Sequence, residues 1–265
     1  MSASAEARQS ELDRVTDSQK PSVVLADQLL SVTDLLRSQA SLRNALADTT
    51  AADSGRRALA EAILASRVTK ATLAVVSEAA ALRWGSGSRL ATAVERQGLR
   101  VLFATAQEKG KLDQVEEELF RFGRVVAADN AVRSALDDRN APLPARQQLV
   151  ADLIAKKADA LTVKLAQRAL VSSHRALEPT LEDYLFIAAE IRHRSIAEVT
   201  VARPLTEAQE QRLEALLVAR LGRPVNLQVV VDPNVLGGAR VKVGDEVIEG
   251  TVAGRLAAAE DQLTQ

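Results

Sequence analysis

Residues 225–255 read VNLQVVVDPNVLGGARVKVGDEVIEGTVAGR, and this stretch decides the fold of the C-terminal part of the chain. Its first seven residues carry apolar side chains at every second position, which is the period of a half-buried strand. Asp232-Pro233-Asn234 then predicts a turn, because Pro restricts φ and Asp and Asn readily cap turns. Further strands are predicted over 239–243 and 247–249, joined by Gly244-Asp245 in a tight hairpin.

Two further features of this stretch concern its glycines and its end. Gly237-Gly238 is interpreted as a bulge or a close backbone approach at a strand start. The alternative, a phosphate-binding loop, lacks the spaced glycines and the Lys-Ser/Thr ending of such loops. After the third strand, Thr251 can cap a helix whose apolar residues recur at helical spacing, namely Val252, Leu256, Ala259 and Leu263.

The segment before this stretch completes a small α/β unit. A short strand is predicted over 198–202 and is stopped by Pro204. Thr206 and Gln209 have the spacing of a capping box, so a helix should begin there and end at Gly222. Its predicted buried residues are Leu213, Leu216, Leu217 and Leu221. We therefore expect a C-terminal α/β sheet domain over residues 196–265, with helices against one face of the sheet.

The composition limits the class of protein. A chain of 265 residues suggests roughly two or three domains. Aromatic residues make up only 2% of it, so its core must consist of Leu, Val, Ile and Ala, which favours helical bundles. The net charge of −1 argues against a nucleic-acid-binding protein and gives no general attraction to anionic lipid. The absence of cysteine excludes disulfides, thiolate zinc sites and cysteine nucleophiles.

The N-terminal sequence MSASAEARQSELDRV has neither a basic start nor an apolar run, so we expect no signal peptide. No window approaches about 18 uninterrupted apolar residues, so no membrane-spanning segment is expected. These patterns predict a soluble protein, which other subunits would hold at a membrane if it works there.

The first two-thirds of the chain contains an internal repeat. Residues 1–20 are polar and suggest a tether, with a frayed helix as the alternative. An offset of about 90 residues then aligns the chain from residue 25 with the chain from residue 115. Leu29 falls on Leu119, and Arg56 falls on Arg146. The register is kept through the loops, which favours a duplicated bundle over two unrelated amphipathic segments.

The two copies are predicted over residues 21–94 and 95–195. A flexible break is expected at 83–88, with the helix resuming from Leu90. Helices are expected over 23–37, 41–46, 54–65, 69–82, 97–108, 111–128, 130–137, 144–155, 159–174 and 179–193. The short loops suit antiparallel packing. The predicted fold class is α+β, with two tandem, mostly antiparallel helical bundles followed by the small C-terminal α/β sheet domain.

No residue pattern indicates catalysis, a metal or a cofactor. His174 and His193 both lie near predicted helix ends, where the helix dipole stabilises the charge of a histidine. Glu116-Glu117-Glu118 is interpreted as a solvated helix face. A Ser-His-Asp arrangement stays open, but no Gly-x-Ser-x-Gly turn supports it. Trp84 and Tyr184 are interpreted as packing or interface residues.

The pattern Val225-x-Leu227, Val231-Asp232, Val235-x-Gly237-Gly238-Ala239-x-Val241-Lys242-x-Gly244 resembles the C-terminal signature of the delta subunit of F-type ATP synthases. This family is the bacterial counterpart of the mitochondrial oligomycin-sensitivity-conferring protein. The following VIEGTVAGRL is similar to the family's Asp-Gly-Ser ending, with Glu249 and Thr251 on either side of Gly250. The likeness extends back to about Leu99. The signature positions are Val231, Asp232, Gly237, Gly238, Val241, Gly244 and Gly250.

This resemblance implies a peripheral-stalk subunit, or stator, without catalytic activity or cofactor. The family's N-terminal six-helix bundle would begin near residue 95, so residues 1–94 would be an added copy. In the family, a groove between the first and fifth helices of that bundle binds an N-terminal helix of an alpha subunit. Here the two helices would span 99–107 and 161–171, and the candidate wall residues are Leu102, Phe103, Leu165 and Leu170.

The resemblance also implies that the C-terminal domain binds the C-terminal region of the membrane-anchored b subunit. The protein would then be peripheral, at the cytoplasmic face of the cell membrane. Two other classes stay open from the residues alone. A helical adaptor unrelated to ATP synthesis would bind neither subunit, and a small hydrolase would show turnover as an isolated chain.

Overall fold

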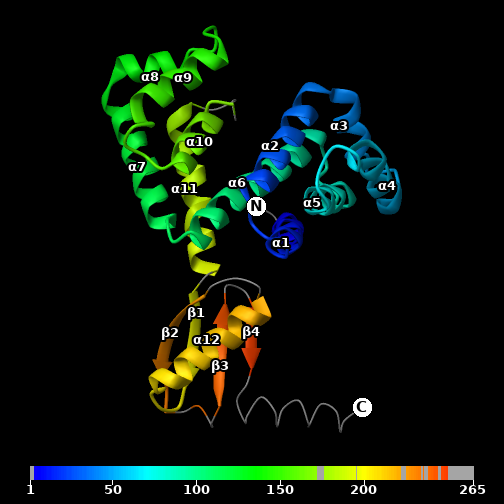
Figure 1. Ribbon diagram of the computed structural model, residues 1–265. Helices are drawn as coiled ribbons and strands as arrows, with labels where there is room; N and C mark the ends of the chain where they lie inside the picture. The colour runs from blue at the N-terminus through cyan, green and yellow to red at the C-terminus, as the bar shows by residue number, and fades with distance from the viewer. Residues whose placement is uncertain are drawn as a thin grey trace. The chain divides into compact units, whose positions relative to one another are not determined.

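The computed structural model describes residues 3–171, 176–194, 196–221, 225–233, 235, 238–243 and 246–249 (Figure 1). The chain forms two compact units, Met1–Ala188 and Ala189–Gln265. The first unit is helical. The second contains a four-stranded sheet and a helix, so the α+β class expected from the sequence is confirmed.

The helices follow the predicted pattern closely. They are α1 Ala3–Asp17, α2 Val23–Ser38, α3 Ala40–Leu46, α4 Asp53–Leu64, α5 Lys70–Ala81, α6 Gly87–Glu108, α7 Leu112–Ala128, α8 Asn130–Asp137, α9 Leu143–Ile154, α10 Ala160–Ala169 and α11 Leu177–Arg194. Several begin at a residue whose side chain accepts a hydrogen bond from the first turn. Ser22, Thr69, Ser86, Asp129 and Asp159 do so for α2, α5, α6, α8 and α10.

The repeat of about 90 residues is visible in the helix positions. α4 begins at Asp53 and α9 at Leu143, which is 90 residues later, and α6 and α11 begin at Gly87 and Leu177 with the same offset. At the same offset, α1 corresponds to residues 93–107 of α6. One continuous helix therefore ends the first copy, which runs from α1 into α6, and begins the second copy, which runs from α6 to α11.

Hydrogen bonds repeat with the same offset as the helices. In the first copy, Gln28 Oε1 accepts from the backbone N–H of Thr69 at 3.0 Å and from Thr72 Oγ1 at 2.6 Å. In the second copy, Glu118 Oε2 accepts from the N–H of Asp159 at 2.8 Å and from Thr162 Oγ1 at 2.5 Å. These equivalent contacts support the duplication inferred from the sequence.

Two details of the predicted organisation need correction. The described part of the proposed tether is helix α1, in which Leu12 is fully buried, so these residues belong to the helical unit. The proposed boundary between residues 94 and 95 falls inside α6. The break predicted at 83–88 is shorter than expected, because Ser86 already caps α6 and Gly87 is its first residue. The sequence of α1 lacks a clear apolar periodicity, because its buried face includes the polar residues Asp13 and Thr16.

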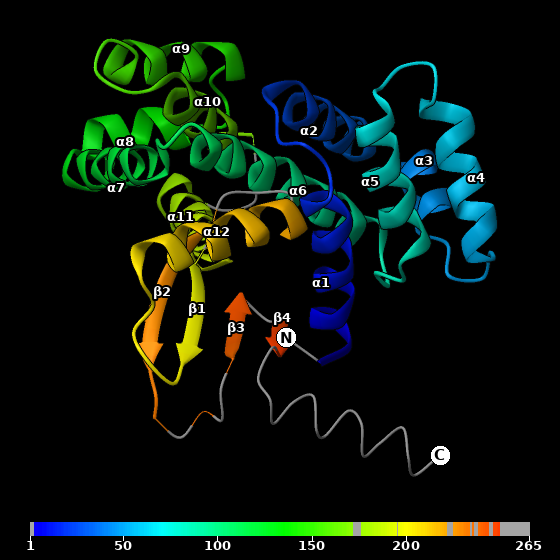
Figure 2. The ribbon, with the colours of Figure 1, turned by 60° about the horizontal axis from the view of Figure 1, so that its bottom comes forward.

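The second unit contains one mixed sheet, in the strand order β2-β1-β3-β4. Its elements are β1 Ile196–Val201, α12 Glu207–Leu221, β2 Asn226–Val231, β3 Ala239–Val243 and β4 Glu246–Glu249. β1 pairs parallel with β2 and antiparallel with β3, and β3 pairs antiparallel with β4. α12 packs on one face of the sheet, as both ribbon views show (Figure 2). The core between them includes Val199, Val241 and Leu217.

The predicted helix start at Thr206 is confirmed, since its backbone N–H donates to Gln209 Oε1 at 2.9 Å. The predicted burial of Leu216 is wrong, because its side chain is 61% exposed. A helix advances about 100° per residue, which turns Leu216 away from the sheet when Leu217 faces it. Gly237, Gly244, Gly250, Leu221, His174 and the helix predicted after Thr251 lie outside the described residues or side chains.

The Gly238 backbone has φ +81°, a left-handed conformation that L-residues rarely adopt. Gly238→Val should therefore lower the free energy of unfolding of the second unit by about 1–3 kcal/mol, because a β-branched residue is strained there. Chemical denaturation followed by circular dichroism measures the loss. Unchanged stability would show that the strand start tolerates a side chain.

Candidate functional site

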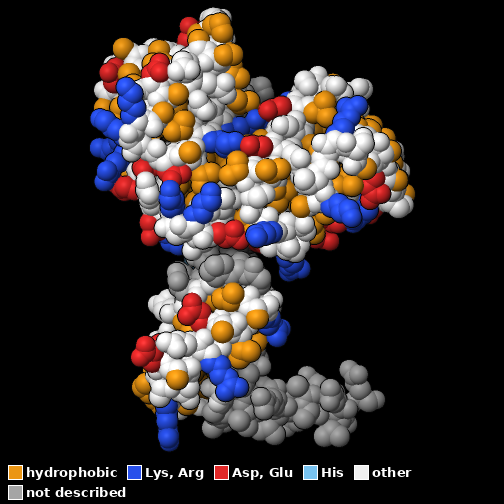
Figure 3. Space-filling model, viewed as in Figure 1, with side chains coloured by type: hydrophobic (Ala, Val, Ile, Leu, Met, Phe, Trp, Pro, Cys, Tyr) orange, Lys and Arg blue, Asp and Glu red, His pale blue; other side chains and the backbone are white. Residues whose placement is uncertain are grey.

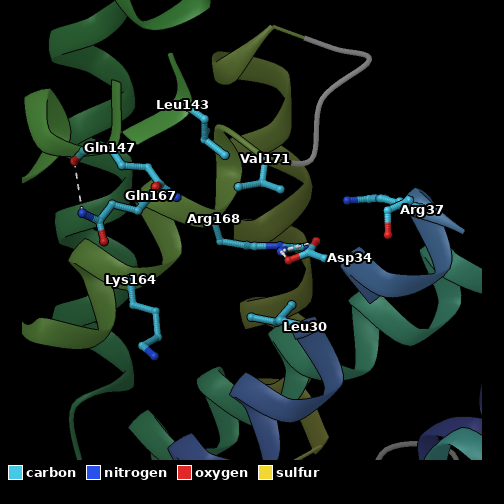
Figure 4. A pocket seen from close by; sticks show the side chains of 10 residues that line it. Leu30, Asp34, Arg37, Leu143, Gln147, Lys164, Gln167, Arg168 and Val171 are labelled. Atoms are coloured by element: carbon cyan, nitrogen blue, oxygen red, sulfur yellow. Dashed lines mark hydrogen bonds and ion pairs between the residues drawn. The ribbon is translucent and has the colours of Figure 1, made fainter. Parts of the chain in front are cut away.

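A cleft of about 660 Å³ lies between the two helical copies (Figure 4). α2 of the first copy forms one side of it, and α9 and α10 of the second copy form the other. The lining residues are Leu30, Asp34, Arg37, Ser38, Leu143, Gln147, Lys164, Gln167, Arg168 and Val171. Most of the surface they expose is apolar, and the charged side chains among them are paired.

Three helices meet beside this cleft through a group of ion pairs. Arg168 on α10 donates to Asp34 on α2, with distances of 2.8 and 2.9 Å to the two carboxylate oxygens. Arg168 also donates to Glu95 on α6 at 3.0 and 2.7 Å. Arg37 on α2 donates to the same Glu95 carboxylate at 3.0 and 2.5 Å. One buried carboxylate thus joins side chains from both copies.

A further pair lies on the same side of α2. Lys164 Nζ donates to the Asp27 carboxylate at 2.5 and 2.7 Å. We call the six residues Asp27, Asp34, Arg37, Glu95, Lys164 and Arg168 the inter-copy clamp. Figure 3 shows acidic and basic side chains adjacent to each other where the two halves of the helical unit meet.

Glu95 stays ionised despite its burial. Its side chain is only 8% exposed. Burial alone would raise the pKa of Glu95, but the guanidinium groups of Arg168 and Arg37 outweigh it and hold the pKa below the ordinary value. For Arg168, burial acts to lower the pKa, yet Glu95 and Asp34 raise it above its ordinary value. The pair therefore carries both charges at neutral pH.

A second buried carboxylate anchors α1 to α6. Asp13 accepts hydrogen bonds from Arg96 at 2.8 Å, from Gln97 at 2.9 Å and from Gln9 at 3.0 Å, while Arg100 lies 3.5 Å away. Burial would raise the pKa of Asp13, but Arg100 and Arg96 lower it overall. These contacts explain why so polar a segment packs against the helical unit.

The four candidate groove residues are buried in the helical unit and none of them lines the cleft, although Leu170 borders a separate, smaller pocket of about 180 Å³. Leu102, Phe103 and Leu165 are fully buried, and Leu170 is 5% exposed. α2 packs along α6, where Leu30 lies so close to Gly98 that an added Cβ would be 2.8 Å from it. α10 nevertheless contributes Lys164 and Arg168 to the cleft, and Val171, two residues beyond its end, also lines it.

The described signature residues shape the second unit. The Asp232 backbone N–H donates to the Val201 carbonyl at 2.9 Å, and the Asp232 carbonyl accepts from the Val235 N–H at 3.1 Å, so the predicted turn is present. Val241 is buried in the core, whereas Val231 is 45% exposed at the end of its strand. These positions are explained by the fold of the sheet.

The clamp was not predicted from the sequence. A signal existed, because Asp27 and Asp34 are two helical turns apart on α2, and Lys164 and Arg168 are one turn apart on α10. Both spacings place the charges on one helix face. Sequence alone did not show that the two faces meet.

Among the described residues, no group of three or more His, Cys, Asp or Glu side chains could hold a metal ion. The described helices also include none with the length and hydropathy needed to span a membrane.

Comparison with known proteins agrees with these features. The family described as "ATP synthase delta (OSCP) subunit" matches residues 100–263, which begin in the second half of α6. "ATP synthase subunit delta" of Streptomyces avermitilis is 43% identical over 96% of this chain and 93% of its own length. The corresponding protein of Cutibacterium acnes is 36% identical over 96% of both chains. These relatives therefore share the first copy, which the family match does not include.

A duplicated helical unit followed by a small α/β unit places the chain in the class of α+β proteins built from helical bundles. Within that class, the match over residues 100–263 and the relatives that match nearly the whole chain decide the family. The chain belongs to the ATP synthase delta (OSCP) subunit family.

Proposed function

We propose that this chain is the peripheral-stalk subunit of an F-type ATP synthase, where it joins the catalytic head to the membrane-anchored b subunit. The observation that carries this proposal is the 43% identity to an ATP synthase delta subunit over 96% of the chain. The role is mechanical and non-catalytic. It places the protein at the cytoplasmic face of the membrane, held there by the other subunits.

The physical task explains why the protein needs several binding surfaces. The rotor turns inside the head, and a head that turned with it would waste the ion gradient. Resistance to torque requires slow dissociation, so nanomolar affinity, about −12 kcal/mol, is appropriate. Several contacts on one chain reach such affinity through effective concentration. The extra helical copy would add one such contact.

For the head, we propose that the cleft binds the amphipathic N-terminal helix of an alpha subunit. The groove residues expected from the family are buried, so the accessible part of this surface is the α10 side of the cleft. Leu143, Val171 and Leu30 supply the apolar contacts that helix-in-groove docking needs. The α/β unit would bind the C-terminal region of the b subunit.

Binding of the full chain to two peptides tests the overall role. One peptide carries the N-terminal helix of the alpha subunit from the same organism, and the other carries the C-terminal region of its b subunit. The stalk function predicts binding of both. A chain that bound neither would instead be an adaptor of another kind, and ATP hydrolysis by the purified chain would indicate an enzyme.

Leu143→Glu should weaken binding of the alpha-subunit peptide at least tenfold, as measured by isothermal titration calorimetry. The substitution places a charge in the apolar wall of the cleft, and a tenfold change corresponds to about 1.4 kcal/mol. Leu153→Glu is the matched control, because Leu153 is on the same helix, is 39% exposed and does not line the cleft. Equal effects of the two substitutions would contradict the assignment of the cleft.

A further inference from the structure

The α10 side of the inter-copy clamp is not repeated at the equivalent described positions of the first copy. At an offset of 90 residues, Lys164 corresponds to Ala74 and Arg168 to Glu78. Glu78 makes a different contact, accepting from Arg57 within the first copy at 2.7 Å. The clamp therefore belongs to the junction between the copies and is not a feature that the bundle fold requires twice.

The clamp residues also form the sides of the cleft. Asp34 and Arg37 on α2 line one side, and Lys164 and Arg168 on α10 line the other. Figure 4 shows Arg168 reaching across to Asp34. α2 and α10 are therefore joined directly through these side chains, with Arg168 bonded to Asp34 and Lys164 to Asp27.

We propose that the inter-copy clamp fixes the width of the cleft and thereby determines which partner helix the cleft accepts. The binding half of this inference rests on the proposed function of the cleft. The other half, that the clamp fixes the width of the cleft, does not depend on that function. Glu95 is the fixed point of the clamp, because it is buried on α6 and holds one arginine from each copy.

The outer pair, Asp27 and Lys164, allows a test in the full chain. Their side chains are 47% and 35% exposed, so both positions tolerate an exchange of charge. Asp27→Lys sets two like charges against each other across the clamp. The double substitution Asp27→Lys/Lys164→Glu restores an opposite pair. Asp34→Asn is a second variant, which removes one partner of Arg168 and leaves Glu95 in place.

The distance between the copies can be measured directly. The chain contains no cysteine, so Ser41→Cys on α3 and Ala145→Cys on α9 introduce two unique labelling positions, both exposed and outside the cleft. Double electron–electron resonance between spin labels at these positions should give one narrow distance distribution in the parent. Arg57→Gln is the matched control, since it breaks an ion pair inside the first copy.

We expect Asp27→Lys and Asp34→Asn to broaden the distance distribution at least twofold, and the charge-exchanged double variant and the Arg57 control to retain the narrow one. Circular dichroism of each labelled variant confirms that its helices are intact. A distribution that stays narrow in both single variants, or that the charge exchange fails to restore, would overturn the clamp.

Affinity for the alpha-subunit peptide separates this inference from the proposed function. A working clamp at a peptide-binding cleft predicts about tenfold weaker binding in Asp27→Lys and recovery in the double variant. If the distances respond as expected but the parent does not bind the peptide, the clamp stands and the proposed binding role of the cleft fails. If the peptide binds equally to all variants although the distances respond, the selectivity half of the inference is wrong.

Discussion

Arg56→Met should lower the free energy of unfolding of the helical unit by about 3–5 kcal/mol. Arg56 is 1% exposed, and its guanidinium donates to the carbonyls of Asp48, Ala51, Ala80 and Ala81 and to the Asp53 carboxylate. These carbonyls lie in the loop before α4 and at the end of α5. Methionine fills a similar volume but leaves all of them without this donor, and the Ala80 and Ala81 bonds that are lost are buried.

The second copy supplies the matched control for this substitution. Arg146 occupies the equivalent position, yet its one described hydrogen bond is to the Leu136 carbonyl at 3.2 Å. Arg146→Met should therefore cost only about 1 kcal/mol. Urea denaturation followed by circular dichroism measures both values. Equal losses would show that the arginines act through packing of their alkyl chains and not through their donors.

Glu95→Gln should also destabilise the helical unit by about 3–5 kcal/mol, because it leaves two guanidinium groups without their shared buried carboxylate. Arg168 is the more affected partner, since its side chain is only 7% exposed. The control is Glu117→Gln, which breaks an exposed ion pair with Arg121. That change should cost less than about 1 kcal/mol. The same denaturation experiment compares the two variants.

Glu95 also makes stability depend on pH. Because its pKa is lower in the folded chain than the ordinary value of 4.5, its contribution is fully present above that value. The contribution is lost as the pH falls through the lower, folded pKa. The parent should therefore lose more stability than Glu95→Gln when it is acidified from about pH 5 to pH 3. Parallel melting temperatures for the two proteins across this range would contradict the assignment.

Sequence periodicity predicted most helices and strands to within a few residues, because apolar residues recur along them at the spacing of the element. The repeat was also visible, since Arg56, Arg146 and the leucines around them keep their offset. Helix α1 was expected only as a frayed alternative to a polar tether, and its burial was not predicted. Its burial depends on Arg96 and Arg100, which lie some 80 residues away in sequence and compensate the charge of Asp13.

The candidate site was only partly predictable. The family resemblance implied a groove between the helices over 99–107 and 161–171, and its binding role stays a prediction. The cleft is lined by α2, α9 and α10, so it shares only the second of those two helices. The resemblance did not anticipate that α2 packs on α6, which leaves Leu102 and Phe103 in the core. Charges on one face of a helix are as typical of an exposed surface as of a contact with another helix. The clamp could therefore be recognised only in the tertiary structure.

Because the two copies share α6, their mutual orientation depends on the number of residues in that helix. A helix turns about 100° and rises about 1.5 Å for each residue. One residue inserted in the middle of α6, Gly87–Glu108, would therefore rotate one copy by more than a quarter of a turn about the helix axis. Substitutions along α6 leave its length unchanged. The insertion or deletion of a single residue would reorient every surface of one copy relative to the other.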